Sequence, residues 1–319
     1  MFEMTLRQML TMFAFMLVGY VLRKGRILPE TSGVTMARLE TYLFVPALTV
    51  YSMATQCTVA TFRDNARLIL YGGVIIACVI LLAIPLSHLF VPNAKTDAER
   101  YQRSIYRYGM SFANAGFMGN FIILGVFGEE MFFKYQMIGL TVTVLCYSYG
   151  VYLLIPKEQN AGLWHNIKKG LTVPPMLAAF VGIAIGLLDL GRFLPPFLVT
   201  MMNNAGSCQG PVAMVLAGFV IAGFPLKELF VNVKMYVVSL VRLIVIPGAI
   251  LLVLHLLHTP KELMALVLIY FGTPLGLNSI VYPEAYGGDV KAGASMASIS
   301  HVMSVATIPL MYLLFIELL

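Results

Sequence analysis

The sequence predicts an all-α integral membrane protein. Of its 319 residues, 59% are hydrophobic and only 11% are charged, and the mean hydropathy is +0.85. A soluble globular protein has about 25% charged residues, so this chain has too few charges to cover a water-facing surface. Apolar stretches of about 20 residues, enough for a helix to cross a bilayer, recur along the chain. We therefore assign the net charge of +6 to cytoplasmic loops and exclude nucleic acid as a partner.

Ten apolar segments are each long enough to cross the bilayer as a helix. We place these spans, numbered 1 to 10, at residues 4–22, 39–59, 66–90, 106–126, 133–155, 172–190, 196–222, 232–256, 262–282 and 293–316. The longest polar link, residues 156–171, separates a first half (1–155) from a second half (172–319). Because each half holds five spans, the halves must insert with opposite orientation, as in the inverted repeats of secondary transporters.

The basic residues indicate an orientation. Thirteen of the 21 lysines and arginines lie in links that follow odd-numbered spans, six lie on the opposite side, and Arg38 and Arg242 lie at or inside span ends. Cytoplasmic loops are enriched in Lys and Arg. We therefore expect a multi-pass protein of the cell (inner or plasma) membrane, with the odd-numbered links in the cytoplasm and both termini outside.

Prolines and asparagines recur at nearly the same offset in the two halves. Pro46 in span 2 precedes Pro211 in span 7 by 165 residues, and Asn114 in span 4 precedes Asn278 in span 9 by 164. Both prolines lie where a helix would be interrupted. Matched interruptions in corresponding spans support the inverted repeat.

Spans 4 and 9 contain the polar and helix-breaking residues that a lipid-facing helix lacks. Span 4 reads GMSFANAGFMGNF from Gly109, and span 9 reads YFGTPLGLNSIVYP from Tyr270. Glycine costs about 1 kcal/mol and proline about 3 kcal/mol relative to alanine inside a helix, so both helices are predicted to break near their midpoints. Two broken helices in corresponding positions indicate a substrate site at the midplane.

The chemistry of these breaks favours a small anion as the ligand. The N-termini of half-helices present unpaired N–H groups and partial positive charge, and the two asparagines add amide donors. The alternative is that the glycines and asparagines only let helices pack closely. The predicted substrate-binding residues here are Asn114, Gly116, Gly119, Asn120, Thr273, Pro274, Asn278 and Ser279, and the predicted helix breaks lie at Pro46, Pro211 and Pro274.

Few ionisable groups lie within the spans. All 15 acidic residues fall in links or near span ends, and we expect the deepest, Glu40, at the cytoplasmic interface. Without a buried carboxylate pair, cation exchange is disfavoured. Arg242 in span 8 either extends back to the cytoplasmic interface or attracts the anion along its path. His301 in span 10 either titrates near neutral pH and contributes to coupling, or is a neutral ring bonded to a serine or carbonyl.

No cofactor or metal is predicted. The four cysteines, Cys57, Cys78, Cys146 and Cys208, are scattered singly, which indicates neither disulfides nor a zinc site. The chain contains no HExxH, GxSxG or Walker A motif. An intramembrane enzyme, or a membrane sensor without net transport, is the alternative to a transporter.

With these features the chain resembles the auxin efflux carrier family, whose bacterial members include malate permease-like proteins. The similarity is carried by Pro46, the Asn114–Gly119 run, Ala205-Gly206 to Pro211, Gly218, Pro247, the TPLG at Thr273–Gly276, the YGGD at Tyr286–Asp289 and Thr307-Ile308-Pro309. It implies a ten-helix fold with crossed broken helices 4 and 9, a scaffold from spans 1, 2, 6 and 7, and a mobile bundle from spans 3–5 and 8–10. It also implies elevator-like alternating access, organic-anion substrates and often a homodimer.

The resemblance places Asn114 in the substrate site and adds Thr49, Ser52, Gln136 and Tyr147 as weaker candidates. One departure is Phe121, which stands about where the family commonly has a proline. We expect Gly116, Gly119 and Asn120 to break span 4 in its place.

Overall fold

The computed structural model describes residues 2–160 and 162–319. Met1 and Ala161, the latter inside the predicted link 156–171, lie outside the described residues. The described residues form helices and no strand, apart from an isolated antiparallel bridge between Ala113 and Leu275. The predicted all-α class is confirmed.

The helices follow one another along the chain with five π-helical and two 3-10 segments (η) between them. In order they are α1 (Phe2–Lys24), α2 (Ser32–Leu39), η1 (Glu40–Phe44), α3 (Val45–Gln56), α4 (Val59–Asn65), α5 (Arg67–Phe90), α6 (Asp97–Ser111), η2 (Ala115–Gly119), α7 (Asn120–Leu145), η3 (Cys146–Gly150), α8 (Val151–Leu154), η4 (Lys157–Gln159), α9 (Leu163–Leu171), α10 (Pro174–Leu187), η5 (Leu190–Phe193), α11 (Pro196–Ile221), α12 (Leu226–Phe230), α13 (Val233–Leu240), η6 (Val241–Val245), α14 (Ile246–Leu256), α15 (Lys261–Gly272), α16 (Asn278–Ala285), α17 (Val290–Tyr312) and η7 (Leu313–Leu318).

Six helical stretches of the described chain are long and apolar enough to cross a membrane, and the bent pair α9 and α10 makes a seventh if it counts as one span. Three predicted spans are not among them. Helices α10 and α15 have only 14 and 12 residues, and the helical run through α2, η1 and α3 does not pass the same test of length and composition. Two others merge, because one stretch runs from Ala115 to Leu154 through a non-helical turn at Gly128. The structure thus supports a membrane protein with several spans.

Large apolar side chains lie on the outer faces of several helices. Leu17 on α1, Leu81 on α5, Phe180 on α10 and Val253 on α14 are all exposed. Exposed side chains of this kind suit helices whose outer faces contact lipid, because the helix itself satisfies its backbone groups.

Two sets of helices pack mainly among themselves. In the first set, α1 packs along α11, and α3 packs against α10 and α11. In the second set, α5 packs against α6 and α7, while α17 packs against α13, α15 and α16. The sets meet where α1 contacts α7 and α17, and where α3 contacts α7.

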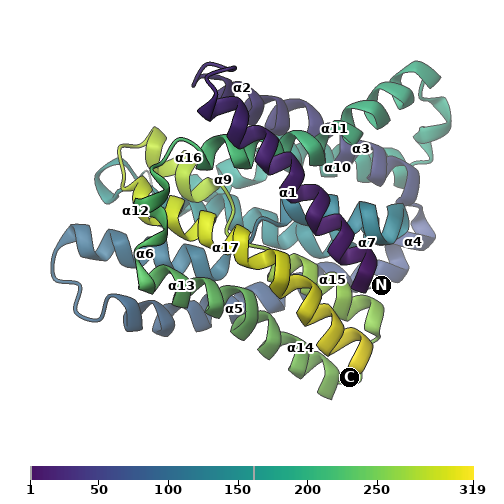
Figure 1. Ribbon diagram of the computed structural model, residues 1–319. Coiled ribbons are helices and arrows are strands. Elements are labelled where there is room, and N and C mark those ends of the chain that lie inside the picture. The colour runs from purple at the N-terminus through teal and green to yellow at the C-terminus, as the bar shows by residue number, and fades with distance from the viewer. Residues whose placement is uncertain (1, 161) are drawn as a thin grey trace.

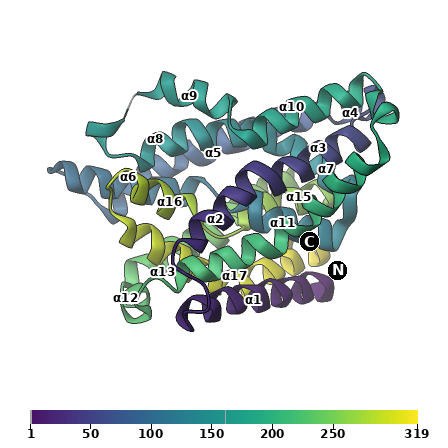
Figure 2. The ribbon, with the colours of Figure 1, turned by 90° about the horizontal axis from the view of Figure 1, so that it is seen from above.

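The chain ends and the loops gather at two ends of the molecule. In Figures 1 and 2, α12 and the loops beside α6 and α16 lie at one end, whereas α4 and both termini lie at the other. The backbone N–H of Phe2 donates to Oε1 of Glu317 over 3.0 Å, so the start of α1 lies beside the end of η7.

Only one of the three predicted breaks at proline is present. Pro274 lies in the non-helical segment between α15 and α16. Pro211 lies inside the continuous helix α11, and Pro46 follows the π-helix η1 as the second residue of α3, so the predicted interruptions at Pro46 and Pro211 were wrong. A π-helical turn absorbs an irregularity without ending the helix, and α11 packs against both α1 and α3.

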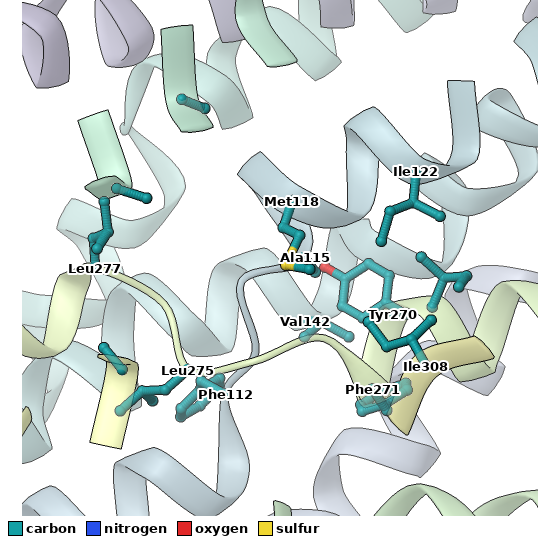
Figure 3. Packing of buried hydrophobic residues seen from close by; sticks show 14 of the residues in the cluster. Phe112, Ala115, Met118, Ile122, Val142, Tyr270, Phe271, Leu275, Leu277 and Ile308 are labelled. Carbon is teal, nitrogen blue, oxygen red and sulfur yellow. The ribbon is translucent and has the colours of Figure 1, made fainter. Parts of the chain in front are cut away.

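The main apolar core surrounds the segments where α6 and α15 end. Figure 3 shows Phe112 beside Leu275, with Ala115 and Met118 farther along the first segment and Phe271 near the end of α15. All five side chains are buried. The unwound backbone is therefore enclosed by protein, which is the condition for its stability at membrane depth.

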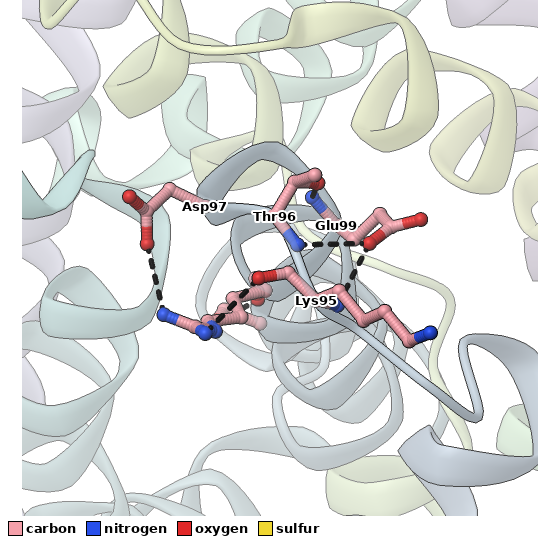
Figure 4. Close-up of polar contacts among 6 residues, drawn as sticks. Lys95, Thr96, Asp97 and Glu99 are labelled. Atoms are coloured by element: carbon pink, nitrogen blue, oxygen red, sulfur yellow. Dashed lines mark hydrogen bonds and ion pairs between the residues drawn. The ribbon is translucent and has the colours of Figure 1, made fainter.

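At the opposite end of α6 the helix begins with a capping box. Oγ1 of Thr96 accepts from the backbone N–H of Glu99 over 3.2 Å, and Oε2 of Glu99 accepts from the backbone N–H groups of Thr96 and Lys95 over 3.0 and 2.8 Å (Figure 4). Both residues thus satisfy N–H groups that a helix start leaves unpaired. This cap sets the start of α6 at Asp97, directly after the polar link between α5 and α6.

Candidate functional site

The first break interrupts predicted span 4. Helix α6 ends at Ser111, Phe112 is extended (φ −114°, ψ 131°), and helical structure resumes with η2 at Ala115. The carbonyl oxygen of Asn114 accepts from the N–H groups of Met118 and Gly119 over 3.0 and 3.1 Å. Span 4 is therefore broken, but at residues 112–114. Gly116, Gly119, Asn120 and Phe121 are already helical, so the expectation that Gly116, Gly119 and Asn120 break the span was wrong.

The second break interrupts predicted span 9. Helix α15 ends at Gly272, Thr273 is extended (φ −70°, ψ 154°), and α16 begins at Asn278. The N–H of Leu275 donates to Oγ of Ser300 over 3.1 Å. Ser279 stabilises the start of α16, because its hydroxyl donates to the carbonyl of Gly276 over 2.9 Å. The break predicted in span 9 is also present.

The two breaks cross. Ala113 and Leu275 form an antiparallel bridge, and the N–H of Asn114 donates to the carbonyl of Pro274 over 2.7 Å. Each unwound segment thereby satisfies a backbone group of the other, in a place where water is scarce. We call this region the crossing, meaning residues 112–119 and 273–278.

A buried histidine holds the side chain of Asn114. Nδ2 of Asn114 lies 3.2 Å from Nε2 of His301, and Nδ1 of His301 lies 2.7 Å from the carbonyl oxygen of Ala297. Because that carbonyl can only accept, Nδ1 carries the proton, and Nε2 accepts from the asparagine amide. Of the two interpretations of His301, the structure favours the neutral ring bonded to a carbonyl.

Two side chains from other helices stabilise the carbonyls of η2. The hydroxyl of Tyr135 on α7 donates to the carbonyl of Ala115 over 3.0 Å, and Nε2 of Gln209 on α11 donates to that of Gly116 over 3.4 Å. A Cβ built at Gly119 would collide with the Tyr135 hydroxyl. Gly119 is therefore a close-packing position and does not line the cavity described next.

A cavity of about 150 Å³ opens beside the crossing. Seven of the predicted residues line it: Thr49, Asn114, Gly116, Asn120, Gln136, Tyr147 and Asn278. A Cβ built at Gly116 would meet nothing within 4 Å, so the backbone there faces open space. Nε2 of Gln136 donates to Oγ1 of Thr49 over 3.3 Å, which brings these two candidates together.

The other predicted residues lie outside the cavity lining. Thr273 and Ser279 are fully buried in the protein, and Pro274 uses its carbonyl to bond Asn114. Ser52 is buried and lines a second cavity of about 310 Å³ between α3, α7 and α11.

Sequence reasoning missed the other lining residues. Among them are Met53, Phe112, Tyr135, Cys146 and Tyr270. The signal for the tyrosines was available, because polar rings inside apolar spans usually have a partner for their hydroxyl.

Asn278 lies at the first turn of α16. Its amide is next to the hydroxyls of Tyr108 and Tyr147 and the thiol of Cys146. Asn114 and Asn278 thus reach the same cavity from the two broken helices, as the matched offsets in the sequence suggested.

Arg242 lies behind this group. Its guanidinium is next to Tyr108, is only 1% exposed, and none of its three nitrogens has a hydrogen-bond partner among the described residues. A side chain so deeply enclosed does not extend to the interface, so that alternative for Arg242 was wrong.

Glu40 is likewise fully buried, which corrects the expectation that it lies at the cytoplasmic interface. The reason is tertiary: η1 packs against α3, α10 and α11, and these neighbours cover the side chain.

Known transporters match the chain over nearly its whole length. Residues 4–312 match the family model described as membrane transport protein. An uncharacterized transporter of Methanocaldococcus jannaschii is 21% identical over 310 residues, which cover 94% of this chain and 96% of that relative. The match includes both breaks and the cavity between them.

Proposed function

Because this chain belongs to the membrane transport protein family, that of the auxin efflux carriers, we propose that it is a secondary transporter for a small organic anion. The substrate class is a mono- or dicarboxylate such as malate, and the membrane is the cell membrane. The observation that carries this proposal is the cavity at the crossing, lined by Asn114 and Asn278 from two broken helices.

The polar groups around the cavity suit a carboxylate. Two asparagine amides and the first N–H groups of η2 supply donors. None of the described lining residues is acidic, so no fixed negative charge opposes an anion. Arg242, enclosed near Tyr108 and with no hydrogen-bond partner among the described side chains, adds a positive charge on the far side of this group.

The size of the cavity favours a small solute. Its volume of about 150 Å³ is below the range of about 300 to 1,000 Å³ that is typical of pockets for drug-sized ligands. Phe112, Tyr135 and Tyr270 form apolar walls beside the amides. A short carbon chain with one or two carboxylates fits both features.

For the mechanism we propose that the first helix set (α1, α3, α10 and α11) is a scaffold and that the second set (α5–α8 and α13–α17) is a transport bundle. Glycines support this division. Within each set a Cβ at Gly19, Gly218, Gly72 or Gly293 would collide with the backbone of a neighbouring helix. Where the sets meet, a Cβ at Gly125 or Gly210 would instead meet the side chains of Gln8 and Phe121. A side chain can change its rotamer as one helix set slides past the other. Two helices in direct backbone contact have no side chain between them that could move aside.

This division corresponds to spans 1, 2, 6 and 7 against spans 3–5 and 8–10, and we propose ten spans in two inverted halves, 1–155 and 172–319. The adjacent termini support an even number of spans. With Cys57, Cys78, Cys146 and Cys208 replaced by serine, a cysteine at Gln159 should react only from the cytoplasm, and one placed after Leu319 only from outside. Labelling of both from one side would contradict the inverted halves.

The transport proposal is tested in vesicles. Purified protein in proteoliposomes should exchange or accumulate at least one radiolabelled carboxylate from a panel that includes malate. Hydrolysis of a peptide or lipid without solute movement would instead favour an enzyme, and binding without flux would favour a sensor. We also propose a homodimer, which mass photometry in detergent would reveal.

A further inference from the structure

Glu40 is a buried acid in a place where the structure offers it no counter-charge. It lies in η1, is 0% exposed, and neither carboxylate oxygen has a hydrogen-bond partner among the described residues. An unpaired carboxylate enclosed in protein is costly, and such a group binds a proton instead of carrying its charge. The negative charge of Glu40 must therefore be neutralised by something other than a neighbouring cation.

The side chain of Gln209 lies beside the carboxyl group. Nε2 of Gln209 donates to the carbonyl of Gly116 in the crossing over 3.4 Å, while Oε1 is buried without a partner. Glu40 can donate to such an acceptor only when it is protonated, since a carboxylate has acceptors alone. A protonated Glu40 would thus complete a chain of donors from Glu40 through Gln209 to Gly116.

No other charge faces Glu40 in the described part of the chain. Of the helices that pack against η1, α10 has no titratable residue and α11 has only Cys208, which is exposed. Helix α3 carries Tyr51 and Cys57. Arg38 at the end of α2 is exposed and does not act on the carboxyl group.

We propose that Glu40 is a proton-binding site that couples proton movement to the position of the transport bundle. This inference rests on the proposed transport function. Glu40 and Gln209 belong to the scaffold, whereas Gly116 belongs to the bundle, so the contact between Gln209 and Gly116 spans the two bodies. In the position seen here this contact occupies Nε2 of Gln209 and leaves its Oε1 available to accept from the protonated acid.

Movement of the bundle would break the contact with Gly116. Gln209 would then turn toward other partners, Glu40 would lose its acceptor, and the proton would leave to water on the side that becomes accessible. Only a proton is bound and released, so no further reactant is needed. A transporter of this kind carries an anion together with a proton, which offsets part of the anion's charge.

The protonation state can be measured without any substrate. Infrared spectra of the purified protein at neutral pH should contain the C=O stretching band of a protonated, non-aqueous carboxylic acid. The band should be absent from Glu40→Gln and retained in Glu30→Gln, a matched change at an exposed glutamate. If Glu40→Gln does not fold, Gln209→Leu serves as the second variant, and it should shift the band because the acceptor is lost. A parent spectrum without this band would overturn the proposal.

Coupling is measured in proteoliposomes with malate as the probe. An inward proton gradient should drive net malate accumulation by the parent and by Glu30→Gln. Glu40→Gln should lose this accumulation at least tenfold yet keep malate exchange at equal pH, because exchange does not require proton release. Accumulation by Glu40→Gln equal to the parent, or dependence on a sodium gradient instead, would overturn the proposal. If the parent moves no carboxylate at all, the proposed function fails, and the infrared result alone decides whether Glu40 holds a proton.

Discussion

The two breaks at the crossing are supported in different ways. The first, residues 112–119, contains no proline and is held by side chains from three other helices: Tyr135 on α7, Gln209 on α11 and His301 on α17. The second, residues 273–278, contains Pro274 and is held by Ser300 on α17 and by its own Ser279. A proline fixes an interruption locally, whereas the first break depends on the surrounding fold.

This difference shows where the crossing can respond to the rest of the protein. Partners of the first break come from both helix sets, because Gln209 lies on α11 of the first set while Tyr135 and His301 lie on α7 and α17 of the second. Partners of the second break belong to the bundle alone. Changes in the relative position of the two bodies should therefore be felt first at residues 112–119.

The largest effect is expected when either asparagine amide is removed. Asn114→Ala or Asn278→Ala should weaken carboxylate binding by about ten- to a hundred-fold, because a hydrogen bond to a charged group contributes about 1.5 to 3 kcal/mol. Leucine at either position should be worse, since it also fills the cavity. Asn120→Ala, at the edge of the first break, is the control with a smaller expected effect, and binding is measured by thermal shift.

The two asparagines also separate ligand binding from packing. If both alanine variants bind and transport like the parent but unfold several degrees lower, the asparagines serve packing. If only Asn114→Ala loses carboxylate binding, the ligand contacts the first break and not the second.

A second prediction compares one glycine from each break. Gly119→Ala should destabilise the protein by about 1 to 3 kcal/mol, since the added methyl would displace the buried hydroxyl of Tyr135. Gly276→Ala should be tolerated, because its Cβ would lie 3.6 Å from the nearest atom, the carbonyl oxygen of Ala113. The melting temperature in detergent measures the stability of each variant. Equal decreases for Gly119→Ala and Gly276→Ala would contradict the expected difference.

A third prediction concerns the hydroxyl groups that support each break. Ser300→Ala leaves the buried N–H of Leu275 without its acceptor, which should cost about 1 to 3 kcal/mol. Tyr135→Phe should cost only about 0.5 to 1.5 kcal/mol, because the carbonyl of Ala115 still accepts from the N–H of Asn120. The reverse order of melting temperatures would mean that the first break depends on a single bond.

The smallest effect is expected far from both breaks, at the capping box of α6. Hydrogen bonds from the backbone of Thr96 and Lys95, with help from the Thr96 side chain, lower the pKa of Glu99 below its usual value. The stability that this adds is present above the usual glutamate range, near about 4.3, and is lost as pH falls through the lowered pKa. Glu99→Gln retains a cap but should flatten the acid side of the melting profile slightly, while Glu158→Gln, an exposed control, should not.

Local chemistry predicted that spans 4 and 9 break, but it did not give the position in span 4, where the break at residues 112–114 precedes the glycines. The runs around Asn114 and Pro274 combine glycine, asparagine and proline inside apolar spans, and their helical cost is a property of the residues themselves. The same local rule failed at Pro211, where the neighbours of α11 keep the helix continuous.

The buried charges were not predictable in this way. Glu40 and Arg242 lie near span ends, and only the packing of η1 and η6 against distant helices encloses them. Gln209 lies 93 residues along the chain from Gly116, whose carbonyl it bonds. No short stretch of the sequence therefore contains both residues. The polarity of Gln209 inside an apolar span was the one available sign.

The glycine contacts also have an entropic consequence. A side chain that is fixed at a helix contact loses rotamer freedom, up to about 2 kcal/mol for the longest ones, whereas glycine loses none. At Gly19 and Gly218, α1 and α11 touch through backbone alone, so this contact fixes no side-chain torsion at either glycine. Where the bodies meet, Gln8 and Phe121 hold their contacts through rotatable bonds. In the proposed transport cycle, rotamer freedom that is released as the two helix sets separate is lost again as they rejoin.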